Sequence, residues 1–384
     1  MKTIIKNAKI VLTDKIFYGN CTIENGKIVY IGSNLDAADN VIDANGKYLL
    51  AGFIDIHCHG GNNFDFMDAS PEEMLEISKF HLLHGTTTLY ATTMSDEMKY
   101  IEKCLQNYSE LVKNNNLLTL NGVHLEGPYL SPSECGAQDT KKMSKPNVKE
   151  ASDLLEKYPF IKRFSVAPEL EGAHDLSSFA KDKGIVMSIA HTAADFDDVI
   201  SAIDNGYTLT THLYSGMHGV YRKNAYRTAG AVEGALYDDR MDVEIIADGK
   251  HLPDGLLKLI YKCKGDSRIC LVTDAMRGSG LLDGQETVLG RREDGVQCII
   301  EDGVAKLPDR TSFAGSVATT DRLVRTMLNI GIDLVSVSKM ASKTPARVMG
   351  LDDRGIIEIG KRADLVILDE NYKVDKVIFN GEII

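Results

Sequence analysis

Short apolar runs alternate with helix-like stretches through the middle of the chain, and each run has the length of a buried strand. Amphipathic stretches such as residues 70–85 and 195–206 separate several runs, and the second closes on Gly206, a residue type common at helix C-termini. Strands that alternate with helices indicate parallel βα units, and eight such units predict a closed (β/α)8 TIM barrel of the α/β class. The eight strand candidates are residues 53–59, 86–93, 121–128, 161–169, 184–192, 207–215, 242–251 and 268–276.

The two ends of the sequence have a different pattern, in which apolar and polar residues alternate over short segments. We therefore expect one small β-sandwich domain, built from residues 1–52 together with 355–384, and a barrel domain in residues 53–354. Both ends contain Asn–Gly pairs, which favour tight hairpin turns, at residues 25–26, 45–46 and 380–381.

One stretch interrupts the alternation of the barrel segment. Residues near 279–311 are rich in glycine and aspartate and predict a β-hairpin insertion. Helices are expected after it, at about residues 316–329 and 333–349.

Composition narrows the range of partners. Of the 384 residues 43% are hydrophobic and 26% are charged, as in ordinary globular proteins, and the formal charge of −12 argues against nucleic acid or an anionic membrane as a general partner. The chain has no apolar stretch near the roughly 20 residues that span a bilayer, and no uninterrupted apolar segment typical of a signal peptide near its start. Seven cysteines without CxxC spacing suit reduced thiols, so we expect a cytoplasmic protein.

Ionisable residues fall at the ends of the predicted strands, where the active site of a (β/α)8 barrel forms. His57 and His59 share one face of the first strand because they are two residues apart, whereas Cys58 points away from them. Glu169, at the end of the fourth strand, is interpreted as a loop anchor. The other strand ends carry Glu126, His191, His212, Asp248, His251 and Asp274.

Imidazole nitrogens and carboxylate oxygens together suit Zn²⁺, Fe²⁺, Mn²⁺ or Co²⁺. Such an ion lowers the pKa of a bound water to about 7, and Asp274 beside that water is the natural general base. The pattern therefore predicts metal-assisted hydrolysis, with either one ion or two, and Glu126 placed to bridge two ions. The predicted metal ligands are His57, His59, Glu126, His191, His212 and Asp274.

These motifs also carry a resemblance. The chain resembles the amidohydrolase superfamily and, within it, the N-acetylglucosamine-6-phosphate deacetylase family. The segments that carry the resemblance occur in that family's order: AGFIDIHCHG, GVHLEGPYLSP, SVAPE, AHTAA, THLYSGM, IADGKHL, LVTDAM and FAGS. HLEGP is the most specific element, since it has a glutamate where many relatives use a carboxylated lysine. The resemblance covers nearly the whole chain.

The resemblance implies hydrolysis of the acetamide of an amino-sugar phosphate, giving acetate and the free amine. The principal ion would be held by Glu126, His191 and His212, while the HxH pair matches members that carry a second ion. Asp274 would be the catalytic acid and base. The resemblance also implies a homodimer, in which an arginine reaches the phosphate bound by the neighbouring subunit. Substrate contacts would come from Ser215, Gly216, His251, Phe313 and Ala314.

The chain departs from the family pattern in three segments that concern the substrate. Gln138 stands where the family usually has histidine, and a neutral amide can donate a hydrogen bond to a carbonyl but cannot carry a proton. Ser215 and Gly216 replace a common Asn–Ala pair, and YRKNAYRTAG replaces an Arg–Glu–Pro–Gly segment, so that Arg222 and Arg227 are both candidates for contact with phosphate.

The departures leave alternatives open. One is deacetylation of another N-acyl amino sugar, such as N-acetylgalactosamine 6-phosphate or an unphosphorylated sugar. A remote one is a catalytically silent metal-binding barrel, against which Asp274 argues, because a structural metal site has no need of a base.

Overall fold

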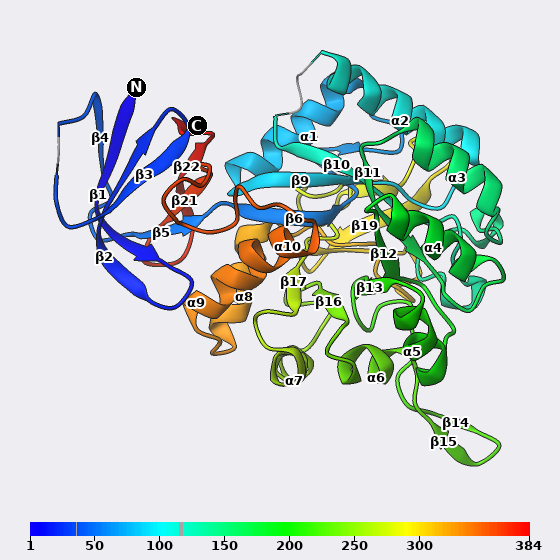
Figure 1. Cartoon of the computed structure of the whole chain (residues 1–384). Helices are drawn as coiled ribbons and strands as arrows, with labels where there is room; N and C mark the ends of the chain where they lie inside the picture. Colours follow the sequence, from blue (N-terminus) through cyan, green and yellow to red (C-terminus); the bar gives the residue numbers. More distant parts are fainter. Residues whose placement is uncertain (36, 115–117) are drawn as a thin grey trace.

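Eight parallel strands form the centre of the molecule (Figure 1). The computed structural model describes residues 1–35, 37–114 and 118–384. Each barrel strand pairs with the next, and the ring closes where residues after the last strand return to the first: the Asp274 N–H donates to the His57 carbonyl (2.9 Å) and the His59 N–H to that of Ala275 (2.8 Å). The predicted barrel is thereby confirmed. Its strands are β6 (Phe53–Cys58), β9 (Thr86–Thr92), β10 (Leu120–Glu126), β11 (Ile161–Val166), β12 (Val186–Ile189), β13 (Tyr207–Thr210), β16 (Asp242–Ile245) and β17 (Ile269–Leu271).

Each barrel strand is followed by a helix on the outside of the barrel (Figure 1). Helix starts follow local capping chemistry: at α1 the Ser70 hydroxyl accepts from the Glu73 N–H while the Glu73 carboxylate accepts from the Ser70 N–H, a reciprocal capping box. The helices are α1 (Pro71–Leu83), α2 (Met98–Lys113), α3 (Val148–Lys157), α4 (Ala173–Asp182), α5 (Phe196–Asp204), α6 (Ala231–Tyr237), α7 (Asp254–Lys264) and α8 (Thr320–Asn329). No helix among the described residues has both the length and the apolar character needed to cross a bilayer.

The barrel has two apolar regions. One lies between the strands and the surrounding helices, and includes Phe53, Phe164 and Leu257. The other fills the interior, where Ile54 and Leu209 belong to one buried cluster with Ala346 of α10 (Thr344–Val348).

Strands from both ends of the chain form one sheet, the terminal sheet, beside the barrel (Figure 1). The long strand β1 changes partner along its length: its first half pairs with β4 and its second half with β5, and the irregularity between the halves contains Asn7, whose φ is 55°. This bend lets the sheet enclose its own apolar core, which includes Ile5, Ile10, Leu49 and Leu365. The strands are β1 (Lys2–Val11), β2 (Ile16–Glu24), β3 (Lys27–Gly32), β4 (Asn40–Asp43), β5 (Tyr48–Ala51), β21 (Leu365–Leu368), β22 (Val374–Phe379) and β23 (Glu382–Ile383).

The three Asn–Gly turns differ in what they connect. Residues 25–26 and 380–381 join antiparallel neighbours, β2 to β3 and β22 to β23, as expected of hairpins. Residues 45–46 have the same positive φ angles, yet β4 and β5 both pair in parallel with β1 and not with each other. The hairpin expected there is wrong, because the local turn chemistry does not specify which strand each arm will pair with.

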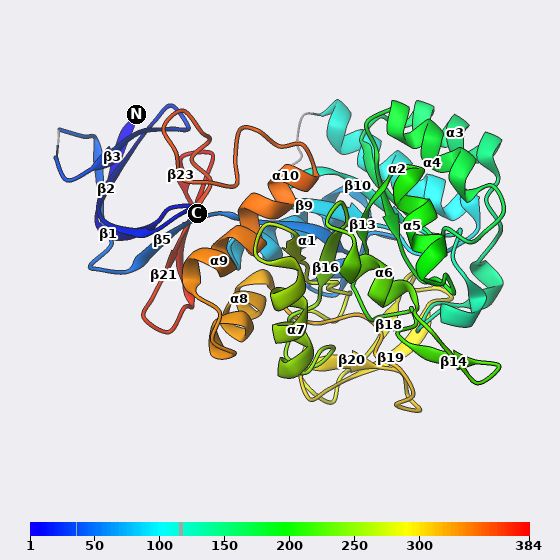
Figure 2. The ribbon, with the colours of Figure 1, turned by 60° about the horizontal axis from the view of Figure 1, so that its bottom comes forward.

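The segment after β17 forms three antiparallel strands and not a single hairpin: β18 (Glu286–Leu289), β19 (Val296–Glu301) and β20 (Val304–Lys306), which lie together at the bottom of the view in Figure 2. The helix that follows begins at Thr320 and not near 316, because Ser316 is hydrogen-bonded in extended conformation to the backbone of Asp274 and Met276. The last expected helix is interrupted by a π-helical turn, Lys339–Lys343, between α9 (Leu334–Ser338) and α10.

Short elements complete the described structure. They are β7 (Gly60–Gly61), β8 (Phe64–Asp65), the 3₁₀ turns η1 (Pro132–Glu134) and η2 (Thr140–Lys142), and the hairpin of β14 (Tyr221–Lys223) with β15 (Tyr226–Thr228), which projects away from the barrel in Figure 1.

Candidate active site

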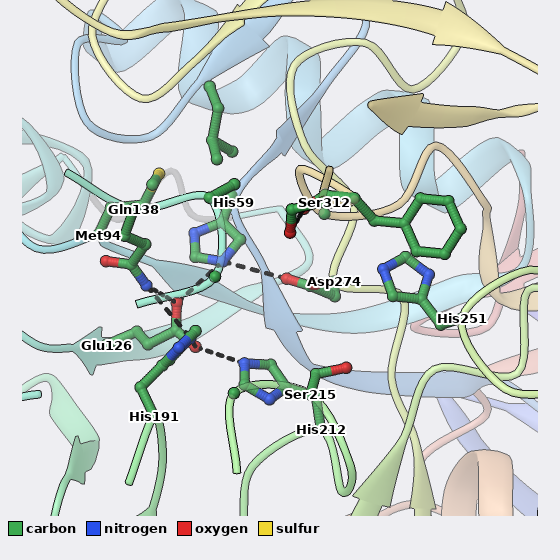
Figure 3. A pocket seen from close by; sticks show the side chains of 16 residues that line it. His59, Met94, Glu126, Gln138, His191, His212, Ser215, His251, Asp274 and Ser312 are labelled. Atoms are coloured by element: carbon green, nitrogen blue, oxygen red, sulfur yellow. Dashed lines mark hydrogen bonds and ion pairs between the residues drawn. The ribbon is translucent and has the colours of Figure 1, made fainter. Parts of the chain in front are cut away.

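Most of the ionisable residues at the strand ends converge on one pocket at the C-terminal mouth of the barrel (Figure 3). Most of them lie just beyond their strands: β12 ends two residues before His191, β13 ends two before His212, and β17 ends three before Asp274. The pocket is lined by His59, Met94, Glu126, Gly136, Ala137, Gln138, His191, His212, Ser215, Gly216, His251, Asp274, Leu289, Ser312, Phe313 and Gly315.

Three side chains form a compact group of metal-ligand type. His57 Nε2 lies 3.2 Å from His59 Nε2 and 3.4 Å from Asp274 Oδ1, and His59 Nε2 lies 3.2 Å from the same oxygen. Ligand atoms around a tetrahedral ion with bonds of 2.0–2.1 Å are about 3.3 Å apart. The spacing and the chemistry of this group therefore fit a divalent ion.

A second group centres on Glu126. Its Oε1 lies 2.9 Å from His212 Nε2, 3.5 Å from His57 Nε2 and 3.6 Å from His191 Nε2. Its Oε2 lies 3.4 Å from His59 Nε2, so the carboxylate faces both groups. Glu126, His57 and His212 thus form a second candidate group, which shares His57 with the first. A bridging role of Glu126 stays a prediction.

Hydrogen bonds fix the orientation of two of the rings. His191 Nδ1 donates to the Glu134 carbonyl (2.7 Å), and His57 Nδ1 donates to the Glu244 carboxylate (3.1 Å). With the proton on Nδ1, the Nε2 lone pair of each ring faces Glu126, as a metal ligand requires. The buried Nδ1 atoms of His59 and His212 have no protein partner among the described residues.

The backbone at this mouth is strained. His191, His212 and Asp274 have φ angles of 41°, 26° and 47°, in the left-handed region that side chains other than glycine rarely adopt. Such conformations cost on the order of 1–3 kcal/mol each and concentrate at functional sites. The strain turns these three side chains toward the pocket.

The site keeps its carboxylates ionised. Burial alone would raise the pKa of Asp274, but hydrogen bonding from His59 and the nearby charges of His57 and His59 lower it to about 2. Burial would likewise raise the pKa of Glu126, but the surrounding imidazoles hold that pKa well below its usual range. Asp274 can therefore accept a proton at neutral pH.

Five of the eight residues predicted to contact substrate line the pocket: Gln138, Ser215, Gly216, His251 and Phe313. His251 Nδ1 is held by the Asp248 carboxylate (2.9 Å), and its ring packs against that of Phe313, 4.9 Å between centroids.

Three predicted contacts are not brought to the pocket of this chain. Ala314 is fully buried outside the lining, and its N–H donates to the Ala305 carbonyl. Arg222 and Arg227 are exposed and pair with each other across the β14–β15 hairpin, which projects away from the barrel (Figure 1). That these three residues contact substrate therefore stays a prediction.

Two lesser interpretations agree with the structure. Glu169 anchors the loop after His191, since its carboxylate accepts from the Thr192 hydroxyl (2.5 Å) and the Ala193 N–H (2.7 Å). The Cys58 thiol points away from the neighbouring imidazoles, with its sulfur 3.3 Å from His81 Nε2.

Sequence reasoning missed Arg163 and Glu244, both fully buried inside the barrel. The available signal was a charged residue inside a run that otherwise has the character of a buried strand. That signal indicates a buried polar contact but does not identify the partner.

Comparisons with known proteins agree with this geometry. The profile of the amidohydrolase family matches residues 48–384. The N-acetylglucosamine-6-phosphate deacetylase of Lysinibacillus sphaericus is 32% identical, covering 94% of this chain and 92% of its own length. The N-acetylgalactosamine-6-phosphate deacetylase of Escherichia coli O157:H7 is 30% identical, covering 90% and 89%.

A solved structure extends the similarity to three dimensions. A mutant N-acetyl-D-glucosamine-6-phosphate deacetylase from Mycobacterium smegmatis, in complex with N-acetyl-D-glucosamine-6-phosphate, superposes with a TM-score of 0.91 at 28% identity and covers 100% of this chain and 99% of its own. The family match and these relatives extend over most of the chain. The chain therefore belongs to the amidohydrolase family of metal-dependent hydrolases.

Proposed function

We propose that the chain hydrolyses the acetamide of N-acetylglucosamine 6-phosphate to glucosamine 6-phosphate and acetate. The observation that carries this proposal is the convergence of Glu126, Asp274 and the imidazoles on a pocket that also contains Gln138 and His251. The full-length similarity to deacetylases of acetamido-sugar phosphates supports the choice of substrate.

We further propose the metal ligands. Glu126, His191 and His212 would hold one ion, and His57, His59 and Asp274 are placed to hold a second. When bound, a divalent ion polarises the amide carbonyl and lowers the pKa of a water. Zn²⁺, Fe²⁺, Mn²⁺ and Co²⁺ all suit these nitrogen and oxygen ligands.

Asp274 is the group that transfers the proton during hydrolysis. The Asp274 carboxylate takes a proton from the water whose oxygen attacks the acetyl carbon. The same residue returns the proton to the sugar nitrogen as the carbon–nitrogen bond breaks, so that acetate and the free amine leave. Gln138 Nε2 is placed to donate a hydrogen bond to the acetyl oxygen.

The phosphate needs a cation that one subunit does not supply. Among the described residues that line the pocket there is no lysine or arginine, and His251 is the basic group farthest from the ligand cluster in Figure 3. Arg222 and Arg227 extend on a projecting hairpin whose Tyr226 is 79% exposed. We propose a homodimer in which one of these arginines reaches the phosphate in the other subunit.

Two further expectations remain part of the proposal. All seven cysteines are free thiols, which supports a cytoplasmic protein. An apolar core formed only by the terminal segments supports a division into a domain of residues 1–52 with 355–384 and a barrel domain of residues 53–354.

Acetate release across a panel of acetamido sugars tests the function, with metal analysis of the same preparation. We expect the highest kcat/KM with N-acetylglucosamine 6-phosphate. Turnover of unphosphorylated N-acetylglucosamine at the same kcat/KM would refute the role of phosphate. The absence of acetate release from every sugar in the metal-loaded protein would favour a silent metal-binding barrel.

The second candidate substrate is N-acetylgalactosamine 6-phosphate. It is favoured by Gln138, Ser215 and Gly216, which differ from the family pattern and face the space where the sugar would bind. The two phosphates differ in the orientation of one hydroxyl, so the ratio of their kcat/KM values decides between them.

A further inference from the structure

A fully buried ion pair lies inside the barrel. Arg163 of β11 donates from Nη1 to Oε1 of Glu244 on β16, and neither side chain is exposed to solvent. Strands β12 and β13 lie between β11 and β16 in the barrel, so the pair spans the interior. Neither residue lines the pocket.

Stability alone does not explain this pair. Barrel interiors are usually filled by branched apolar side chains, and removing two charges from water costs several kcal/mol per ion. Replacing such a pair by apolar residues of similar volume is often neutral or stabilising. We therefore expect the pair to have a role other than stability, which its other hydrogen bonds indicate.

The contacts of Glu244 lead to two predicted metal ligands. Its Oε2 accepts from His57 Nδ1 (3.1 Å) and from the backbone N–H of His212 (3.2 Å). The first bond holds the proton on Nδ1 and directs the Nε2 lone pair of His57 toward Glu126 and Asp274. The second holds the backbone of His212 at its strained φ of 26°.

Two further hydrogen bonds of Arg163 reach the same two segments, while its Nε donates to the Ser188 hydroxyl on β12 (3.1 Å). Nη1 donates to the carbonyl of Ile56 (3.1 Å), and Nη2 donates to the hydroxyl of Thr211 (2.8 Å). Ile56 directly precedes His57, and Thr211 directly precedes His212. The guanidinium therefore connects both ligand-bearing chain segments to the carboxylate that orients them.

We infer that Arg163 and Glu244 are positioning residues that fix His57 and His212 for metal binding. The inference rests on the proposed function, since it assumes that these histidines hold ions. Partners that orient a ligating histidine typically contribute 10–100-fold to metal affinity. Because neither residue touches the pocket, their loss should act on metal binding and kcat more than on KM.

The test compares Glu244→Gln with Asp242→Asn. Asp242 lies on the same strand and is also a buried carboxylate paired with arginine (Arg347 Nη2, 2.7 Å), but it lies at the opposite end of β16 from the pocket. We expect Glu244→Gln to weaken metal binding by about 10–100-fold in competition with a chelator, and to change the visible absorption of the Co²⁺-loaded protein. Its kcat should fall while KM changes by less than about twofold. Asp242→Asn should leave the metal affinity and the Co²⁺ spectrum unchanged.

A double variant, Arg163→Met with Glu244→Met, separates positioning from a structural role. We expect it to fold, with one cooperative thermal transition, while metal affinity stays low. Wild-type metal affinity and an unchanged Co²⁺ spectrum in this variant and in Glu244→Gln would overturn the inference. If Glu244→Gln does not fold, the double variant decides alone. Failure of the wild-type protein itself to bind metal would instead refute the proposed function.

Discussion

Gln138 donates a hydrogen bond from Nε2 to Oε2 of Glu126, 3.0 Å away. Its own Oε1 accepts from the backbone N–H of Ser95, also at 3.0 Å, which fixes the amide so that its NH₂ group faces the ligand cluster (Figure 3). The side chain therefore presents a donor to the pocket through a group that does not titrate.

This orientation predicts the effect of removing the donor. Gln138→Ala should lower kcat by about 10²–10³-fold, because in the proposed reaction the variant lacks the amide donor for the developing oxyanion. Met94→Leu, which changes a lining side chain without a donor, serves as the control. Steady-state acetate release measures both, and equal kcat values in the two variants would contradict a role of Gln138 in the reaction.

Asp274 should be indispensable for proton transfer. Asp274→Asn should lower kcat by about 10²–10⁴-fold, since the amide cannot accept the proton from water. The ion proposed at Glu126, His191 and His212 should stay bound, because these three ligands remain. Turnover and metal content are measured on one preparation, and an undiminished kcat would remove Asp274 from the mechanism.

Metal removal should abolish activity reversibly. Dialysis against a chelator should end acetate release, and addition of Zn²⁺, Mn²⁺, Co²⁺ or Fe²⁺ should restore it to different degrees. At ion concentrations about 100 times Kd, binding should add about 2.7 kcal/mol to the free energy of unfolding. A chelated protein with full activity and unchanged Tm would contradict the metal site.

His59 should control the number of ions. Its Nε2 belongs to the group with His57 and Asp274, whereas His191 and His212 contact Glu126 without it. We therefore expect metal analysis to give two ions per chain for the wild type and one for His59→Ala. Equal metal content in both proteins would show that His59 holds no separate ion.

A buried histidine outside the pocket predicts a pH effect on stability. Burial lowers the pKa of His81 from 6.5 to about 4, and its Nε2 lies 2.9 Å from the Gly60 carbonyl. Because the folded protein favours the neutral ring, its contribution is complete above pH 6.5. It is lost as pH falls from 6.5 toward 4, by roughly 3 kcal/mol in all.

His81→Gln keeps a donor for Gly60 but removes the titrating group. The Tm of the metal-free variant should therefore fall less between pH 7 and pH 4.5 than that of the metal-free wild type. Parallel Tm curves over this range would show that His81 does not carry the effect.

The barrel and the convergence of most of its strand-end residues could be predicted from the sequence because both follow from local pattern. The apolar runs identify strands, and the fold class then places their C-terminal ends at one mouth, which brings Glu126, His191 and Asp274 together. Contacts across the barrel interior could not be predicted in this way. Arg163 and Glu244 meet through three-dimensional closure, and neither residue's sequence neighbours indicate the other.

The substrate residues show a second limit. Phe313 lines the pocket while the adjacent Ala314 is buried behind it, and a motif that contains both does not say which one faces the sugar. Arg222 and Arg227 lie on a hairpin whose direction depends on tertiary packing, and the phosphate contact proposed for them would need a second subunit.

The pairing of β5 with β21 has a consequence for synthesis of the protein. Strand β5 leads directly into the barrel through β6, yet its partner, Leu365–Leu368, lies near the other end of the chain. During translation the edge of β5 therefore stays open until residues 365–368 have left the ribosome. The nascent barrel can form its βα units in order, but the sheet that supports its first strand is completed only after all eight barrel strands have been made.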